Sequence, residues 1–417
     1  MLQSLLNAWK LPDLRKRLLF TAFIIALYRF GSYVPVPGVD LRALEELFAG
    51  QGVFAFFDLF AGGALERVAV FALGIMPYIT ASIIFQLLTV VIPQLEALAK
   101  EGESGAKKIN QYTRYTTVGL ALIQSVAFVS LFQTQGAFPP DNPLTPLKFY
   151  LIVFTLTVGT ALVMWMGELI TQRGIGNGIS LIIFASIVSR LPGGIYNMIR
   201  VMNPLEWLAM ALIAFAVVVA IVMIQEGQRR IPIQYAKRVV GRKMYGGQST
   251  YLPLRVNMAG VIPVIFASAV LLFPVTLAQM TPWQWAQDLG EVFNPGGWLY
   301  LSIEVLLIIA FTYFYTAVQF NPLDQADNLK KYGGFIPGIR PGRPTAQYLD
   351  RVLTRITLPG ALFLASIVVL PTLLIRFMGV PFFFGGTSLL IVIGVALDTM
   401  KQMESQLLMR HYEGFLK

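Results

Sequence analysis

The placement of lysine and arginine constrains this chain more than any other feature of its sequence. Hydrophobic stretches long enough to cross a bilayer alternate with connections that are either rich or poor in these residues. With the N-terminus in the cytoplasm, 25 of the 32 basic residues fall on the cytoplasmic side. This bias follows the positive-inside rule and predicts a multi-pass membrane protein with both termini in the cytoplasm. Ten such stretches begin near Leu18, Val68, Thr116, Phe149, Ile179, Trp207, Met258, Trp298, Leu358 and Phe384.

The composition agrees with a membrane protein and removes several kinds of chemistry. Hydrophobic residues make up 56% of the chain and charged residues 13%, and the mean hydropathy is +0.66. The chain has no cysteine, which excludes disulfides, thiolate catalysis and sulfur-ligated metals. The single histidine, His411, lies in the polar C-terminal tail and cannot build a zinc site or an intramembrane Ser-His pair. We therefore expect no catalytic residues, no metal and no cofactor.

Ten spans divide into five and five, with the split near residue 200. An odd number of spans in each half places two homologous halves in opposite orientations, which is the usual architecture of proteins that move something across a membrane. The sequence thus predicts an all-α polytopic fold with an N-terminal half over 1–200 and a C-terminal half over 201–417.

Two stretches depart from the pattern of uniform 20-residue spans. The fifth, Ile179 to Met198, is apolar only over its first half and contains Pro192. The second follows a half-hydrophobic stretch, Phe54 to Val70, and then Gly74 and Pro77, which favour a break in a helix. Irregular backbone at membrane depth is tolerated only against protein or water.

Two long basic loops, about 226–256 and 321–357, carry interleaved tyrosines, glycines and prolines. Loop charge alone is consistent with simple positive-inside connectors. Their length favours docking hairpins for partners, because long structured connections are usually functional. The net charge of +10 comes from such loops and indicates anionic lipid, an acidic partner or RNA on that side.

Motifs for chemistry are scarce. No Walker-type phosphate loop occurs, and the glycines at 174, 176 and 178 indicate a tight turn after a span. A polar set in the spans either glues helices together or marks an interface that opens and rehydrates: Thr80, Ser82, Gln86, Gln124 and Asn257. These features leave open a channel, a secondary transporter of a small solute and, less well supported, an intramembrane enzyme.

Seven long strings covering nearly the whole chain resemble the family of bacterial SecY proteins, the channel subunits of the protein-secreting translocon. They span Phe60–Val91, Lys100–Tyr115, Glu168–Ser180, Gly227–Arg238, Gln248–Ser268, Phe320–Gly342 and Phe382–Ile393. The resemblance implies an hourglass pore that conducts unfolded preproteins and inserts membrane proteins laterally. It also implies a bacterial cytoplasmic membrane location.

The same resemblance implies roles for individual residues. A constriction ring would be formed by Ile75, Ile79, Ile179, Ile183, Ile265 and Ile391. A short plug helix over about 57–71 would hold Asp58, Gly62, Gly63, Glu66 and Arg67. A lateral gate between the second and third spans on one side and the seventh and eighth on the other would use Thr80, Ser82, Gln86, Gln124 and Asn257.

The resemblance further implies a set of partners. Small membrane subunits similar to SecE and SecG would accompany the chain, and signal peptides, preproteins and anionic lipids would contact it. The SecA motor ATPase and the ribosome, through its rRNA, would dock on the basic loops, using Arg238, Arg242, Lys243, Lys330, Lys331 and Arg340.

Overall fold

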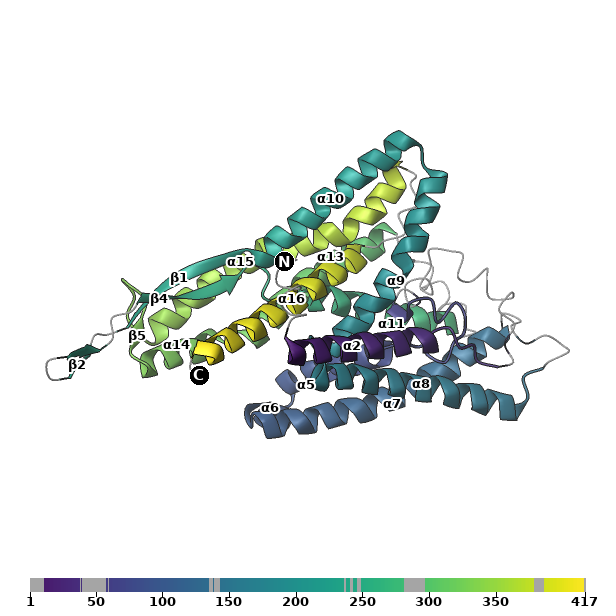
Figure 1. The fold of residues 1–417 in the computed structure, drawn as a ribbon, viewed down its shortest axis with the longest axis horizontal. Helices are drawn as coiled ribbons and strands as arrows, with labels where there is room; N and C mark the ends of the chain where they lie inside the picture. The colour runs from purple at the N-terminus through teal and green to yellow at the C-terminus, as the bar shows by residue number, and fades with distance from the viewer. Residues whose placement is uncertain are drawn as a thin grey trace. The chain divides into compact units, whose positions relative to one another are not determined.

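A computed structural model describes residues 11–37, 39, 58, 60–134, 138, 143–235, 238–240, 243–245, 249–280, 297–378 and 386–415 (Figure 1). The chain divides into two compact units. The first comprises Met1–Val201, Leu271–Tyr300 and Ile391–Lys417, and the second comprises Met202–Val270 and Leu301–Leu390. The predicted division at residue 200 into two inverted halves stays a prediction.

Long helices dominate both units. Within the described ranges, six helices are long and apolar enough to cross a membrane, or seven if one bent pair forms a single span. They identify a multi-pass membrane protein, and the count of ten spans stays a prediction. The helices of the first unit are α2 Pro12–Gly31, α5 Met76–Val91, α6 Pro93–Lys100, α7 Glu103–Thr134, α8 Pro146–Arg173 and α9 Gly178–Val201.

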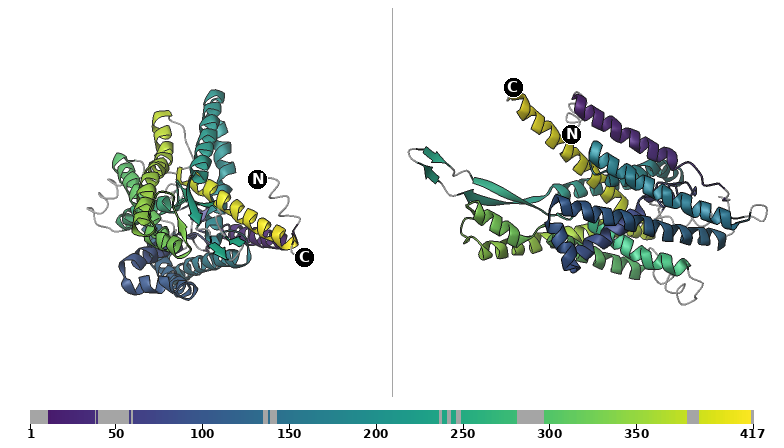
Figure 2. Two further views of the ribbon diagram at one scale, coloured as in Figure 1. Left: turned by 90° about the vertical axis from the view of Figure 1, so that its left-hand side faces the viewer. Right: turned by 90° about the horizontal axis from the view of Figure 1, so that it is seen from below.

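In the first unit, α7 and α8 lie side by side and form its broadest helix contact (Figures 1 and 2). α5 packs on α7, while α2 and α9 pack on α8. The axis bends by 100° between α5 and α6. Ile92 is extended there (φ −99°, ψ 114°), because the following Pro93 disfavours the helical conformation in the residue before it.

The break predicted before the second span is present, and it is longer than a kink. Helix α5 begins only at Met76, and residues 62–75 form successive turns with one isolated bridge. Where a short helix was expected, only Asp58, Phe60 and Ala61 are helical among the described residues of 57–71. Gly62, Gly63 and Gly74 have φ values of 65°, 85° and 55°, a left-handed conformation that interrupts a right-handed helix.

The second unit combines helices with a small antiparallel sheet. Its order is β4-β1-β5, with β1 Gln228–Tyr235, β4 Ser249–Arg255 and β5 Gly334–Phe335. β1 pairs with β4 from Gln228↔Arg255 to Gln234↔Ser249, so the first basic loop forms a long hairpin. At its tip, β2 Arg238–Val240 pairs with β3 Lys243–Tyr245 (Figure 1).

The remaining helices complete the two units. They are α10 Pro204–Glu226, α11 Ile262–Met280, α13 Trp298–Gln319, α14 Pro322–Lys331, α15 Arg343–Met378 and α16 Gly386–Phe415. One face of the β1–β4 hairpin packs on α15 through a buried cluster that includes Ile231, Leu254 and Leu349. This packing anchors the base of the hairpin to a long helix.

Candidate functional site

The five residues predicted for the plug lie together in the turn-rich segment Phe60–Ile75 and its preceding Asp58, which we call the plug segment. Two backbone hydrogen bonds tie it to the stretch that follows α2. The Val36 N–H donates to the Val68 carbonyl and the Val70 N–H donates to the Val34 carbonyl, each at 2.9 Å. These bonds satisfy buried polar groups that a segment without helix or sheet would otherwise leave unpaired.

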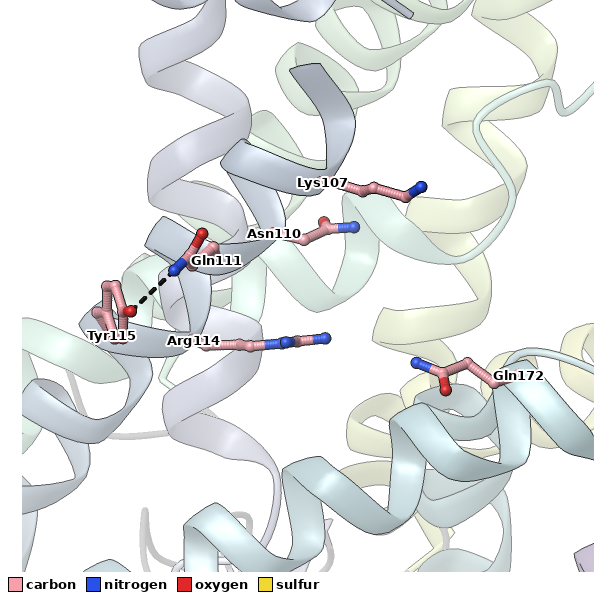
Figure 3. A pocket seen from close by; sticks show the side chains of 6 residues that line it. All are labelled: Lys107, Asn110, Gln111, Arg114, Tyr115 and Gln172. Carbon is pink, nitrogen blue, oxygen red and sulfur yellow. Dashed lines mark hydrogen bonds between the residues drawn. The ribbon is translucent and has the colours of Figure 1, made fainter. Parts of the chain in front are cut away.

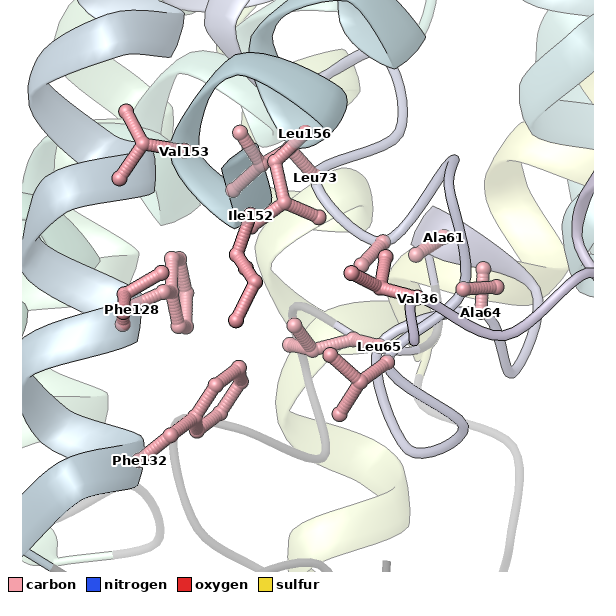
Figure 4. Close-up of a cluster of buried hydrophobic side chains, with 14 of the residues drawn as sticks. Val36, Ala61, Ala64, Leu65, Leu73, Phe128, Phe132, Ile152, Val153 and Leu156 are labelled. Carbon is pink, nitrogen blue, oxygen red and sulfur yellow. The ribbon is translucent and has the colours of Figure 1, made fainter. Parts of the chain in front are cut away.

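The plug segment is seated on α7 and α8 by a buried hydrophobic cluster (Figure 4). Leu65, 1% exposed, meets Phe128 and Phe132 from α7 and Ile152 and Leu156 from α8. The small residues Ala61, Ala64, Ala69 and Ala72 of the segment are also buried in this cluster. At about 25 cal/mol per Å² of apolar surface, such burial is a substantial part of what holds the segment in place.

One glycine of α8 permits a very close approach of the plug segment. A Cβ atom added at Gly159 would lie 1.9 Å from the Val70 carbonyl oxygen. That distance is far inside van der Waals contact, and the obstructing atom belongs to the backbone. The absence of a side chain at Gly159 is therefore a condition for the observed seat.

Ionic and hydrogen-bonding groups hold the polar side of the plug segment. Arg190 of α9 pairs with Asp58, and its Nη2 lies 3.0 Å from Glu66 Oε2. Arg29 of α2 donates to the Gly62 carbonyl at 2.8 Å. Arg67 stacks over the Tyr33 ring at 4.3 Å. Neighbouring helices thus contact the segment through charge as well as through apolar packing.

Asp58 is the most buried acid of the plug segment, with 1% of the residue exposed. Its Oδ1 accepts hydrogen bonds from the N–H groups of Leu65 and Glu66, each at 3.0 Å. Burial raises the pKa of the Asp58 carboxyl above its ordinary value, although the Arg190 guanidinium beside it acts to lower that pKa. The carboxylate is therefore costly to bury, and Arg190 offsets part of that cost.

The predicted ring isoleucines occupy helices of both units. Ile75 and Ile79 are buried at the start of α5, Ile183 is buried in α9, and Ile179 is half-buried one turn before it. Ile391 is buried in α16, and Ile265 is half-buried in α11 of the second unit. The closure of the six side chains into one ring stays a prediction.

The predicted gate residues contain two buried polar atoms without a protein partner in the described part of the chain, Gln86 Oε1 and Asn257 Oδ1. Asn257 also donates from Nδ2 to the Gly260 carbonyl at 3.0 Å, and Thr80 donates to the Met76 carbonyl at 3.1 Å. Ser82 and Gln124 are half-buried, the first in α5 and the second in α7. Unpaired buried amides are costly in a static core and suit a contact that exchanges partners.

The predicted docking residues lie in the second unit. Lys330 and Lys331 are exposed at the C-terminal end of α14, and Arg340 is exposed before α15. The backbone of Arg238 and Lys243 lies in the paired strands β2 and β3, whereas Arg242 lies outside the described residues. The structure therefore presents Lys330, Lys331 and Arg340 to solvent.

A polar pocket of about 450 Å³ near the start of α7 was not predicted from the sequence (Figure 3). It is lined by Lys107, Asn110, Gln111, Arg114, Tyr115 and Gln172. Its two cations have acidic partners, because Lys107 pairs with Glu103 and Arg114 with Glu168. The lining is consequently close to neutral.

Sequence reasoning also missed Arg190 and Arg29 as contacts of the plug segment. Both lie in predominantly apolar helices, α9 and α2. An ionisable residue in such a helix usually has a specific partner and a function. That signal was present in the sequence, but it did not identify the partner.

Comparisons with known proteins agree with one another over almost the whole chain. The SecY family model matches residues 69–400. The protein translocase subunit SecY of Streptomyces scabiei is 49% identical over 444 aligned residues, and that of Mycobacterium tuberculosis is 48% identical over 446. In both cases the match covers 100% of this chain and 100% of the relative.

Solved structures with a similar fold are channels. The structure of a protein-conducting channel matches with a TM-score of 0.65 and 19% identity, covering 94% of this chain and 92% of that one. Canine Sec61 in a ribosome–channel complex from the endoplasmic reticulum matches with a TM-score of 0.61 and 19% identity, with the same coverage. At these identities the likeness concerns the fold.

Proposed function

The chain belongs to the SecY family and is a protein translocation channel, and we propose that it carries unfolded secretory preproteins across the bacterial cytoplasmic membrane and releases membrane segments sideways into lipid. Relatives at 48% to 49% identity over the full chain support the channel function. In this proposal the pore is passive, and a bound motor ATPase or ribosome supplies the work.

The observation that carries the proposal is the seat of the plug segment. Residues 60–75 are irregular backbone between α2 and α5, yet most of their side chains are buried against α7 and α8. Irregular backbone in a membrane protein needs protein or a water-filled cavity around it. A folded plug next to a pore meets that requirement, and its limited secondary structure allows it to leave the seat without unfolding a helix.

The same proposal gives the pore its constriction. Ile75 and Ile79 follow directly on the plug segment, at the first turn of α5. With Ile179, Ile183, Ile265 and Ile391 they would form a ring that excludes water when empty and deforms around a passing chain. Ten spans in two inverted halves, 1–200 and 201–417, with both termini in the cytoplasm, would surround this ring.

We further propose a lateral gate between the second and third spans and the seventh and eighth. The buried unpaired atoms Gln86 Oε1 and Asn257 Oδ1 support it, because such groups gain hydrogen bonds when the contact opens to water or to a polar chain. Thr80, Ser82 and Gln124 would complete the polar face of the gate.

For the partners, the proposal places a SecE-like and a SecG-like subunit beside the spans and anionic lipids around the basic face. The exposed side chains of Lys330, Lys331 and Arg340 would receive a SecA-type motor or ribosomal RNA, together with Arg238, Arg242 and Lys243. A ribosome partner is supported by the fold likeness to channels solved with ribosomes, canine Sec61 and yeast Ssh1.

Translocation into vesicles tests the proposal. The chain is reconstituted with its small membrane partner, and a signal-bearing preprotein is offered with and without the motor ATPase and ATP. Protection of the preprotein from protease that requires both motor and ATP is the expected result. Absence of protection despite correct insertion and motor binding would refute the proposal.

A further inference from the structure

Arg190 joins the plug segment to α9 through two carboxylates. Its guanidinium pairs with Asp58 and Glu66, which are 132 and 124 positions earlier in the chain. We propose that Arg190, Asp58 and Glu66 form a clamp that keeps the plug segment seated, so that Arg190 is a positioning residue for the closed channel. This inference rests on the proposed function.

The two carboxylates of the clamp differ in burial, and this difference assigns their roles. Asp58 is 1% exposed, while the Glu66 side chain is 48% exposed. Water screens the exposed pair with Glu66, which contributes little by itself. The buried pair with Asp58 dominates, because removing Arg190 would leave an uncompensated charge inside the protein.

Asp58 also shapes the loop that Arg190 holds. Its Oδ1 accepts the N–H groups of Leu65 and Glu66, while Oδ2 faces Arg190. The carboxylate thereby closes the stretch from Asp58 to Glu66 into one unit. A single guanidinium on α9 consequently holds the whole stretch, including the side chain of Leu65 in the apolar cluster.

The backbone of α9 approaches the plug segment at the same place. A Cβ atom at Gly62 would lie 3.0 Å from Ser186 Cα, one helical turn before Arg190. The Ser186 hydroxyl is hydrogen-bonded to the Tyr28 hydroxyl at 2.7 Å, and Tyr28 donates to the Ala61 carbonyl at 3.3 Å. The clamp therefore reinforces an existing contact, and movement of α9 away from the segment would stretch the ion pair first.

Thiol exposure measures the clamp directly, because the natural chain has no cysteine. Leu65→Cys places a probe in the plug cluster, and Met403→Cys places one in a separate buried cluster with Leu14 and Ile175. Each is introduced into the full chain, purified with its small membrane partner in detergent, and reacted with a maleimide. The rate of labelling reports how often each site becomes exposed.

Arg190→Ala is expected to raise the labelling rate at position 65 roughly tenfold or more and to leave the rate at position 403 unchanged. Arg200→Ala is the matched control, because Arg200 lies on the same helix but contacts the Tyr196 ring. That control is expected to label like the unsubstituted background at both positions.

A rescue separates the clamp from a general structural role. Asp58→Asn keeps a side-chain oxygen for the N–H groups of Leu65 and Glu66 but removes the charge that Arg190 compensates. Arg190→Ala combined with Asp58→Asn should therefore return labelling at position 65 to within about threefold of the background. Arg190→Lys, which keeps the charge, should also recover most of the protection.

The inference is overturned if Arg190→Ala leaves labelling at position 65 unchanged, if position 403 becomes equally reactive, or if neither rescue restores protection. Protease-protection assays on the chain with no substitutions run in parallel. Failure of that chain to translocate a preprotein would refute the proposed function, whereas the labelling rates would still decide whether Arg190 holds the segment.

Discussion

Replacing Gly159 by alanine should displace the plug segment and open the seal of the resting channel. The new Cβ would lie 1.9 Å from the Val70 carbonyl oxygen. An ordinary contact requires more than 3 Å, so the backbone of the segment or of α8 must retreat by about 1 Å or more. The obstructing atom is a peptide oxygen, which cannot rotate away as a side chain can.

The size of the effect follows from the packing. Inserting one carbon into a filled site costs about 1 to 3 kcal/mol. Because each 1.36 kcal/mol is a factor of ten, the seated state should lose roughly 5- to 150-fold in population relative to the displaced state. A helix gains stability from replacing glycine by alanine, by up to about 1 kcal/mol, so a loss of the seal would arise from the contact with Val70.

Ion leak through reconstituted vesicles measures the seal in the absence of preprotein. Gly119→Ala on α7 is the matched control, because a Cβ there meets nothing within 4 Å. Gly31→Ala is a graded comparison: its Cβ would lie 2.1 Å from the Phe71 ring, a side chain that can shift. We expect the largest leak from Gly159→Ala, a smaller one from Gly31→Ala and none from Gly119→Ala.

A resting leak in Gly159→Ala equal to that of the unsubstituted channel would refute the reasoning. It would mean that α8 moves to accommodate the methyl group while the plug segment stays seated. The thiol probe Leu65→Cys distinguishes the two cases in a variant that folds, since labelling at position 65 must rise if the segment moves.

Further predictions concern the ring, the docking surface and the buried acid. Ile391→Asn should hydrate the constriction, raising ion leak and letting preproteins with defective signal sequences pass; unchanged leak and stringency would count against the ring. Arg340→Glu should weaken motor-dependent secretion by roughly ten- to a hundredfold, the equivalent of about 1.5 to 3 kcal/mol for hydrogen bonds to a charged group, and normal secretion would exclude the role. Because burial raises the pKa of Asp58, the native chain holds that proton more tightly than the unfolded chain, so this group makes the free energy of unfolding fall as pH rises between the ordinary and the raised pKa. Thermal unfolding across that window should lose this component in Asp58→Asn, and an identical pH profile would contradict the assignment.

Local chemistry explains why much of the molecule could be predicted from the sequence. Hydropathy and the charge of the connections indicated a multi-pass helical membrane protein, because a helix that crosses lipid must satisfy its own backbone and hide its charges. The break before α5 was visible in Gly74 and Pro77, since both residues disfavour a continuous helix. The long strings shared with SecY proteins indicated the family.

Some local signals gave the wrong local structure. Pro192 and its following glycines suggested an interruption in the fifth span, yet α9 is continuous from Gly178 to Val201. The plug segment was expected to be helical, and residues 62–75 are turns. In both places packing against neighbouring helices outweighs the local preference, because propensity differences are small compared with the burial of apolar side chains.

The sequence by itself therefore determined which residues belong in membrane-spanning helices, which connections carry the positive charge, and to which family the chain belongs. Only the tertiary structure decided that Arg190 pairs with Asp58, that Arg114 pairs with Glu168, and that Gly159 lies against Val70. Each of these contacts joins positions more than 50 residues apart. Hydropathy and periodicity describe neighbours along the chain, whereas such contacts depend on how the backbone brings distant helices together.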